Sequence, residues 1–228
     1  MPSLSLCIIA KDEEKFLLDC LSSVQGIVDE IVVCDTGSQD RTREIARSAG
    51  AILIEHTWTD DFSAARNAAL KASSGTHILV LDADERLMSG AKRVLREALS
   101  QDWDLALLPL HNASTLTASE EEVRSGQARR GEPVMLPRLF RRSDDLCWEG
   151  VIHESPTGWL TRAPRRVIEL DAHILHFGAV PELRQARGKR TRNVALLEQR
   201  TQVEPKNPQV WAYLAGEYLH QGKVAEAE

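Results

Sequence analysis

The first part of the chain alternates between short apolar runs and segments with a helical pattern. Apolar runs typical of buried strands occupy residues 4–10, 30–35, 51–54 and 77–81. Helical patterns separate them, one from Asp12, a natural N-cap, to Gly26, one from residue 40 to Gly50, and one from Ser63 to Ser73. Strands and helices that alternate in this way predict an α/β fold with a mostly parallel, doubly wound sheet and right-handed crossovers.

Polar and acidic clusters follow three of these apolar runs. They occupy residues 11–14, 35–40 and 82–85. In a parallel doubly wound sheet, ligands bind beyond the carboxyl ends of the strands, so the three clusters should open onto one edge. Any one cluster alone is equally typical of a solvated turn. Their convergence favours a nucleotide site.

Asp82 and Asp84 give this site its chemistry. Side chains two positions apart in an extended chain point the same way, here across the small residue Ala83. Two such carboxylates repel each other unless a divalent cation or a shared proton relieves the charge. Oxygen ligands suit Mg²⁺ or Mn²⁺, and such ions hold phosphates in nucleotide sites. The pair therefore predicts a metal-bound phosphate.

Composition limits the partners of the protein. The 228 residues allow one large domain and an appendage, with 43% hydrophobic and 27% charged residues. A formal net charge of −6 argues against general nucleic-acid binding. The cysteines form no Cys-x-x-Cys pair, so neither a disulfide framework nor a zinc site is indicated. Without a secretion signal or an apolar run of about 18 residues, we expect a cytoplasmic protein, at most peripheral at a membrane.

The turn after the first apolar run argues against two common nucleotide-binding folds. A dinucleotide-binding domain needs Gly-x-Gly-x-x-Gly there, and a phosphate-loop NTPase needs Gly-x-x-x-x-Gly-Lys-Ser/Thr. The chain instead has Lys-Asp-Glu-Glu at residues 11–14, without a glycine.

Four blocks of sequence carry a resemblance to a known family. They are residues 6–14 (LCIIAKDEE), 35–42 (DTGSQDRT), 62–67 (FSAARN) and 81–85 (LDADE). In this order they resemble the family-2 glycosyltransferases of the GT-A fold. The resemblance covers about the first ninety residues, and the four blocks together are specific.

The resemblance implies roles for individual residues. The pocket for a base and ribose, usually of uridine, would be formed by Ala10, Lys11, Glu13, Glu14, Asp35 and Ser38. Arg66 and Asn67 would lie near the diphosphate. Asp84 would bind a metal bridging its oxygens, while Asp82, next to Ala83, would face the ribose or support the metal. Family members mostly invert the configuration of the sugar and use UDP-sugars with Mn²⁺ or Mg²⁺.

Later motifs resemble a subgroup of this family with small acceptor regions. They are Arg-Leu-Phe-Arg at 138–141, Gly-x-Ile-His-Glu at 150–154 and His-x-Gly at 176–178. We expect strands at residues 104–110, 138–142 and 148–154, with a loop or short helix at 111–131. Glu154 is the candidate catalytic base, with His153 positioning it or competing for the role, and His176 would complete the metal shell. The alternative without chemistry is that Glu154 pairs with an arginine such as Arg138.

The residue pattern after position 180 predicts helices. A long helix should start at Pro181 and carry a basic stripe formed by Arg184, Arg187, Lys189, Arg190 and Arg192. After a linker at 204–208, the spacing of Trp211, Leu214, Tyr218 and Ala227 matches a tetratricopeptide repeat.

We therefore divide the chain into a GT-A domain, residues 1–180, and a helical extension, residues 181–228. One repeat cannot bury its own face, so the extension is a candidate for a protein partner or self-association. We expect residues 205–228 to be dispensable for nucleotide binding.

These features predict a metal-dependent, inverting glycosyltransferase. Its donor would be a nucleotide-sugar, of the UDP type, and its acceptor a saccharide, a lipid-linked molecule or a peptide. A sugar-1-phosphate nucleotidyltransferase is the alternative among enzymes, but it needs a glycine-rich, basic loop where residues 12–14 are acidic. A non-catalytic scaffold that binds nucleotide and presents the helical extension is the alternative outside enzymes.

Overall fold

A single sheet organises the computed structural model, which describes residues 2–186 and 189–227. The strands are β1 (Leu4–Ala10), β2 (Glu30–Asp35), β3 (Ile52–Glu55), β4 (His77–Val80), β5 (Glu85–Leu87), β6 (Leu105–Asn112), β7 (Val134–Arg141), β8 (Val167–Glu169) and β9 (Ile174–His176). Within the described residues the sheet has nine strands in the order β3-β2-β1-β4-β7-β6-β9-β5, and β8 pairs with β6. The strands β3, β2, β1 and β4 are mutually parallel, as the alternating pattern predicts.

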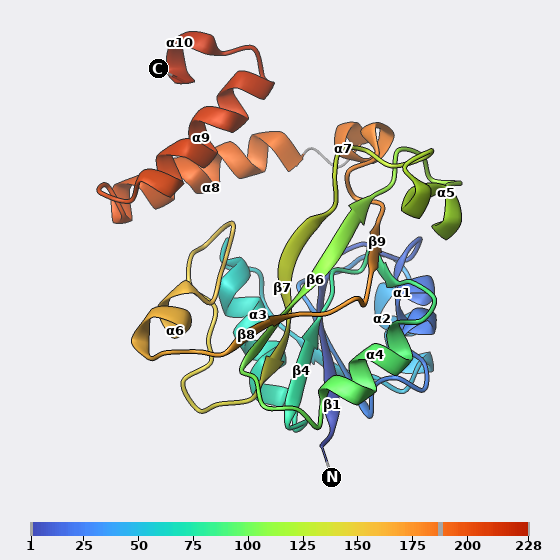
Figure 1. The fold of residues 1–228 in the computed structure, drawn as a ribbon. Coiled ribbons are helices and arrows are strands. Elements are labelled where there is room, and N and C mark those ends of the chain that lie inside the picture. The colour runs from blue at the N-terminus through green and yellow to red at the C-terminus, as the bar shows by residue number, and fades with distance from the viewer. Residues whose placement is uncertain (1, 187–188, 228) are drawn as a thin grey trace.

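Helices cover both faces of this sheet (Figure 1). The first six are α1 (Leu17–Ser23), α2 (Thr42–Ser48), α3 (Phe62–Ala72), α4 (Ala91–Ala98), α5 (Glu120–Ser125) and α6 (Thr157–Arg162). Leu17 of α1 and Leu95 of α4 pack with Leu79 in one core, whereas Ala69 of α3 packs with Ile78 in another. Because successive residues of β4 enter different cores, the strand is buried on both faces. The predicted α/β fold class is confirmed.

The turn after β1 differs from our expectation. Asp12 does not cap a helix, because its backbone is left-handed at φ 54° and α1 begins only at Leu17. The Asp12 carboxylate instead accepts a hydrogen bond of 2.7 Å from the backbone N–H of Gln39. Residues 11–16 form bends and turns at the end of β1 in place of the first turn of a helix.

The aspartate segment is also not an extension of its strand. β4 ends at Val80, and residues 83–84 form a turn that the N–H of Glu85 closes by donating to the carbonyl of Asp82 at 2.9 Å. The expectation that Asp82 and Asp84 point the same way on an extended chain is wrong for this reason. Each carboxylate has its own set of neighbours, as described below.

The strand predicted at residues 148–154 is absent from the described structure. This segment has only an isolated bridge between Glu149 and Ser155. Two left-handed residues interrupt it, Gly150 at φ 97° and His153 at φ 49°. It is a loop whose end, residues 152–154, lies at the cleft described below. The strand at 138–142 and the short helix within 111–131 agree with prediction.

The C-terminal helices are α7 (Pro181–Ala186), α8 (Lys189–Val203), α9 (Pro208–His220) and α10 (Val224–Ala227). Asn207 caps α9 by accepting from the N–H of Gln209 at 3.1 Å, and Pro208 occupies the first turn, where its missing N–H costs nothing. Arg184, Arg187, Lys189 and Arg190 of the predicted basic stripe lie outside the described side chains. None of the described helices is long and apolar enough to span a bilayer.

The helical extension packs against the loop that ends at Glu154. Val194 and Leu197 of α8 and Leu214 of α9 share a core with Ile152. Arg200 of α8 donates a hydrogen bond to the carbonyl of Ile152. The extension therefore has a defined contact with the sheet domain, while the domain boundary at residue 180 stays a prediction.

Gly75 generates a prediction about stability. A Cβ on Gly75 would lie 2.5 Å from Ser5 Oγ and 2.7 Å from Ser5 N, which is too close for the backbone to remain in place. Gly75→Ala should lower the free energy of unfolding by about 1–3 kcal/mol, the usual cost of overpacking, as measured by urea denaturation. Gly216→Ala is the control, because a Cβ there meets no atom within 4 Å and alanine favours the helix. Equal stability of the two variants would contradict the prediction.

Candidate functional site

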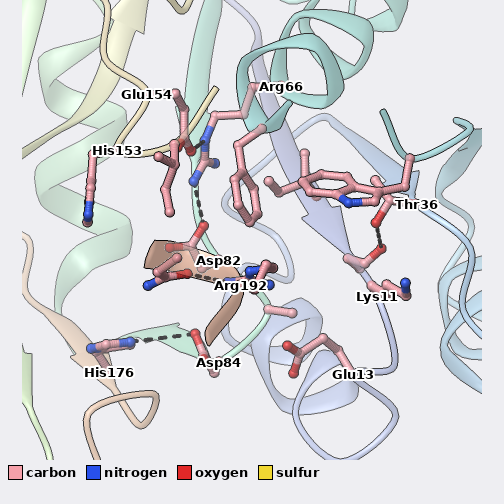
Figure 2. A pocket seen from close by; sticks show the side chains of 17 residues that line it. Lys11, Glu13, Thr36, Arg66, Asp82, Asp84, His153, Glu154, His176 and Arg192 are labelled. Carbon is pink, nitrogen blue, oxygen red and sulfur yellow. Dashed lines mark hydrogen bonds and ion pairs between the residues drawn. The ribbon is translucent and has the colours of Figure 1, made fainter. Parts of the chain in front are cut away.

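A cleft of about 540 Å³ lies at the carboxyl edge of the parallel strands (Figure 2). Its walls come from the ends of β1 and β2, the start of α3, the turn after β4, the loop at 152–154, β9 and α8. The lining residues are Ile9, Ala10, Lys11, Glu13, Thr36, Trp58, Phe62, Arg66, Asp82, Ala83, Asp84, Ile152, His153, Glu154, His176, Arg192 and Asn193. Segments far apart in the sequence thus meet beyond the carboxyl ends of the parallel strands, where sheets of this kind bind ligands.

Most of the predicted site residues line this cleft. They are Ala10, Lys11, Glu13, Arg66, Asp82, Ala83, Asp84, His153, Glu154 and His176. Glu14, Asp35, Ser38 and Asn67 do not belong to the lining, and each has a different set of contacts. The roles of all of these residues stay predictions.

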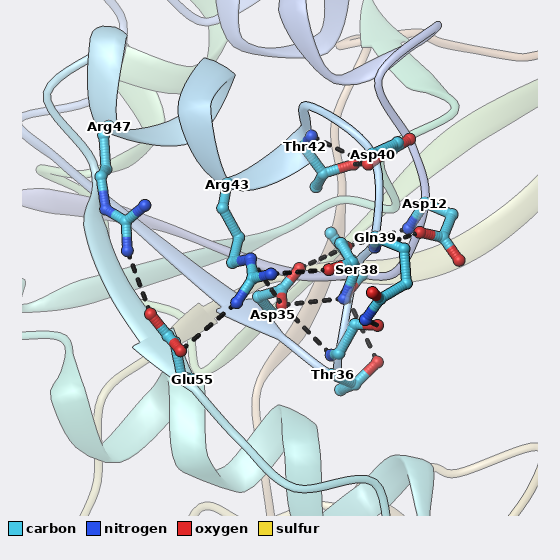
Figure 3. A network of polar contacts seen from close by, with 12 residues as sticks. Asp12, Asp35, Thr36, Ser38, Gln39, Asp40, Thr42, Arg43, Arg47 and Glu55 are labelled. Carbon is cyan, nitrogen blue, oxygen red and sulfur yellow. Dashed lines mark hydrogen bonds and ion pairs between the residues drawn. The ribbon is translucent and has the colours of Figure 1, made fainter.

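Asp35 lies beneath the turn that follows β2 (Figure 3). Its side chain is 1% exposed, and Oδ1 accepts from the N–H groups of Gly37 and Ser38 at 3.1 Å each. The hydroxyl of Ser38 donates to Asp35 and accepts from the N–H of Asp12 at 3.0 Å. These bonds lock the turn after β2 to the turn after β1. In this structure Asp35 holds the wall of the cleft, and Thr36 is the residue of that turn that reaches its surface.

Asn67 and Glu14 likewise contact protein groups. The Asn67 side chain accepts from the N–H of Trp148 and donates to its carbonyl, both at 2.9 Å, and so fastens the loop after β7 to α3. Glu14 accepts from the N–H of Arg41 at 3.2 Å and forms an ion pair with its side chain at 3.5 Å. Both residues therefore fix the shape of loops around the cleft.

Arg66 is the central cation of the cleft. Its Nη2 donates to Asp82 Oδ1 at 2.8 Å, and its Nε donates to Glu154 Oε1. Arg138 lies 3.5 Å from the other oxygen of Asp82. Burial alone would raise the pKa of Asp82, but Arg66 and Arg138 hold that pKa well below its usual range. Asp82 is therefore ionised and shared between two arginines.

Asp84 lies opposite His176, which the pairing of β5 with β9 brings next to it. The distance from Asp84 Oδ1 to His176 Nε2 is 3.6 Å. The other ring nitrogen, Nδ1, lies 2.7 Å from the side-chain oxygen of Asn112. Because an amide oxygen can only accept, Nδ1 carries a proton, and Nε2 is the ring nitrogen that faces Asp84. This arrangement is typical of a histidine prepared to bind a metal.

The backbone of Gly178 lies close to both of these groups. A Cβ at this position would lie 2.5 Å from Asp84 Oδ2 and 2.5 Å from His176 Nε2. The part of the chain that the structure describes contains no group of three or more His, Cys, Asp or Glu residues that could hold a metal. A carboxylate and an imidazole are nevertheless sufficient for Mn²⁺ or Mg²⁺ when water and substrate phosphates complete the shell. The residues present fit such an ion.

Several residues of the site were missed by the sequence analysis. Asn112 ends β6, and its position after an apolar run is the same signal that identified Asp82 and Asp84. Thr36 and Phe62 fall inside the quoted blocks but had no separate chemical signature. Arg192 and Asn193 lie far along the chain within a helical pattern, which does not reveal what the helix packs against.

Residues 5–163 match the model of glycosyl transferase family 2, so the chain belongs to that family. It is 37% identical over 240 residues to a TPR repeat-containing protein of Synechococcus elongatus, covering 100% of this chain and 55% of that protein. It is 26% identical over 221 residues to the SPbeta prophage-derived glycosyltransferase SunS of Bacillus subtilis, covering 96% and 50%. The chain spans about half the length of these curated relatives.

Among solved structures, S. aureus TarS 1–349 in complex with UDP-GlcNAc is similar in fold. The TM-score is 0.58 at 15% sequence identity, over 96% of this chain and 73% of that one. The likeness at this identity concerns the fold alone. Together with the family match, it confirms the predicted resemblance to family-2 glycosyltransferases of the GT-A fold.

The close approach of Gly178 to Asp84 and His176 leads to a prediction about metal binding. Gly178→Ala would place a methyl group 2.5 Å from Asp84 Oδ2 and from His176 Nε2, so it should displace these two candidate ligands and lower Mn²⁺ affinity about tenfold or more. Isothermal titration with MnCl₂ measures this directly, and circular dichroism checks that the fold is retained. Gly216→Ala is again the matched control. Unchanged Mn²⁺ affinity in Gly178→Ala would place the metal elsewhere.

Proposed function

We propose that this protein transfers a sugar from a UDP-sugar to an acceptor nucleophile, with Mn²⁺ or Mg²⁺ as cofactor and with inversion at the anomeric carbon. The observation that carries the proposal is the Asp84–His176 pair, which lies in one cleft with the turns after β1 and β2. Membership in glycosyl transferase family 2 supports the reaction class. The TarS complex with UDP-GlcNAc supports the expectation that a cleft of this fold accepts a nucleotide-sugar.

The two ends of the cleft suit different parts of the donor. Lys11, Glu13 and Thr36 lie where the turns after β1 and β2 are locked together, and this rigid wall suits the base and ribose. Asp84 and His176 would hold the metal, with Asn112 fixing the imidazole. A divalent ion bound there would spread the negative charge that develops on the departing diphosphate.

Glu154 is the proposed general base. An inverting displacement needs a proton acceptor on the side of the sugar opposite the leaving group, and Figure 2 shows Glu154 well separated from Asp84. Its Oε1 accepts from Arg66, which orients the carboxylate toward the cleft it lines. His153 is the competing base. Partial desolvation lowers the pKa of its imidazole below the ordinary value, so His153 is neutral near pH 7 and able to accept a proton.

Metal-dependent UDP binding is the first test. With UDP at about 100 times its dissociation constant and Mn²⁺ present, the free energy of unfolding should rise by about 2.7 kcal/mol, as followed in a thermal-shift assay. Asp84→Asn should keep the fold and lose the Mn²⁺-dependent part of this shift. Asp102→Asn is the control, because Asp102 is 85% exposed and lies outside the cleft. Metal-independent UDP binding that is equal in both variants would exclude the proposed site.

Glu154→Gln tests the general base. The substitution removes the proton acceptor and keeps the size of the side chain, so kcat for UDP release from a UDP-sugar should fall by about 10²-fold or more. Because the substitution also breaks the ion pair with Arg66, circular dichroism must show that the fold is retained, and affinity for the donor should then change less than kcat. Glu149→Gln is the matched control, because the Glu149 side chain is 52% exposed and pairs with Arg162 outside the cleft. Near-normal turnover in Glu154→Gln, together with loss in His153→Asn, would assign the role to His153.

A further inference from the structure

The helical extension contributes two residues to the cleft. Arg192 and Asn193 of α8 line it together with residues of the sheet domain. Figure 2 shows the Arg192 side chain reaching into the space between Asp82 and Glu13 in this view. The Arg192 guanidinium lies over the ring of Phe62, 5.0 Å from its centroid. An arginine from outside the sheet domain therefore faces the predicted donor site.

Specific contacts hold α8 in this position. Arg200, two turns further along α8, donates to the carbonyl of Ile152, and Val194 and Leu197 are buried against the same loop. Asn193 accepts from Arg192 at 3.0 Å and donates to Glu217 of α9 at 3.1 Å. The direction of Arg192 is thus fixed by neighbours on both α8 and α9.

The charges in the cleft distinguish Arg192 from Arg66. Arg66 is engaged by the carboxylates of Asp82 and Glu154. Arg192 forms no ion pair with any carboxylate among the described residues, although Asp60 and Glu154 are near enough to influence it. Desolvation lowers the pKa of the Arg192 guanidinium below its usual range. Asp60 and Glu154 raise this pKa, but by less than desolvation lowers it. A guanidinium that lines the cleft over Phe62 and has no carboxylate partner among the described residues is well suited to an anionic ligand.

We propose that Arg192 binds the diphosphate of the donor, so that the helical extension completes the nucleotide-sugar site. This inference rests on the proposed function of the same cleft. A planar guanidinium donates two parallel hydrogen bonds to phosphate oxygens, and such charge-assisted bonds are stronger than neutral ones. Arg192 and the metal at Asp84 then contact the diphosphate from different elements of the fold. Lys11, the other cation of the lining that has no carboxylate partner among the described residues, lies beside Thr36 at the end assigned to the base.

The test separates the diphosphate from the base. Titration calorimetry in saturating Mn²⁺ compares UDP and uridine on the wild-type chain, Arg192→Ala and Arg192→Lys. Arg192→Ala should lower UDP affinity by about tenfold or more, the usual effect of losing a charged hydrogen bond, and leave uridine affinity unchanged. Arg192→Lys should recover part of the loss because it keeps the charge. Arg93→Ala is the control for net charge, since the Arg93 side chain is 75% exposed and lies outside the cleft.

The outcomes distinguish this inference from the proposed function. If the wild-type chain does not bind UDP, the proposed function falls and this inference falls with it. If the wild-type chain binds UDP and Arg192→Ala binds it equally well, only the role of Arg192 is refuted. If Arg192→Ala loses UDP and uridine to the same extent, Arg192 acts on the base end or on the shape of the cleft, which also contradicts the assignment.

Discussion

The cleft depends on the double ion pair made by Arg66. This one side chain joins α3, the turn after β4 and the loop at residues 152–154 through Asp82 and Glu154. The Arg66 and Glu154 side chains are only 12% and 11% exposed, so water solvates neither charge fully. Breaking a buried pair of this kind by removing one partner typically costs about 3–5 kcal/mol, because a buried charge is left uncompensated. The turn that carries Asp82 and Asp84 and the loop that carries Glu154 take their relative positions from this junction.

The sheet and the position of the cleft could be predicted because their signals are local. Apolar runs that end in acidic clusters identified β1, β2 and β4 and the edge at which their polar residues meet. The resemblance added Arg66 from the family blocks and His176 from the later motifs, and the structure brings both to one cleft with Asp84. Burial on both faces of β4 follows from its continuous apolar sequence, so this part of the fold is encoded over short distances.

The features that could not be predicted from the sequence depend on contacts between residues that are not neighbours in a regular pattern. Asp82 and Asp84 were expected on one extended strand, but the hydrogen bond that closes the turn at Glu85 directs them to different partners. Residues 148–154 have the composition of a strand, yet Gly150 and His153 adopt left-handed conformations and Arg200 of a remote helix binds the carbonyl of Ile152. No periodicity in the sequence reveals that Asn112 lies beside His176, since 64 positions separate them.

The stack of His153 on Tyr213 joins the cleft to the repeat-like helices. The two rings lie 4.1 Å apart between centroids, at an interplanar angle of 26°. Tyr213 belongs to α9 and His153 to the wall of the cleft, so docking of the helices and occupancy of the cleft share an interface. A change in the packing of Tyr213 therefore acts on His153 and on the wall of the cleft, and any coupling free energy between these two places acts equally in both directions.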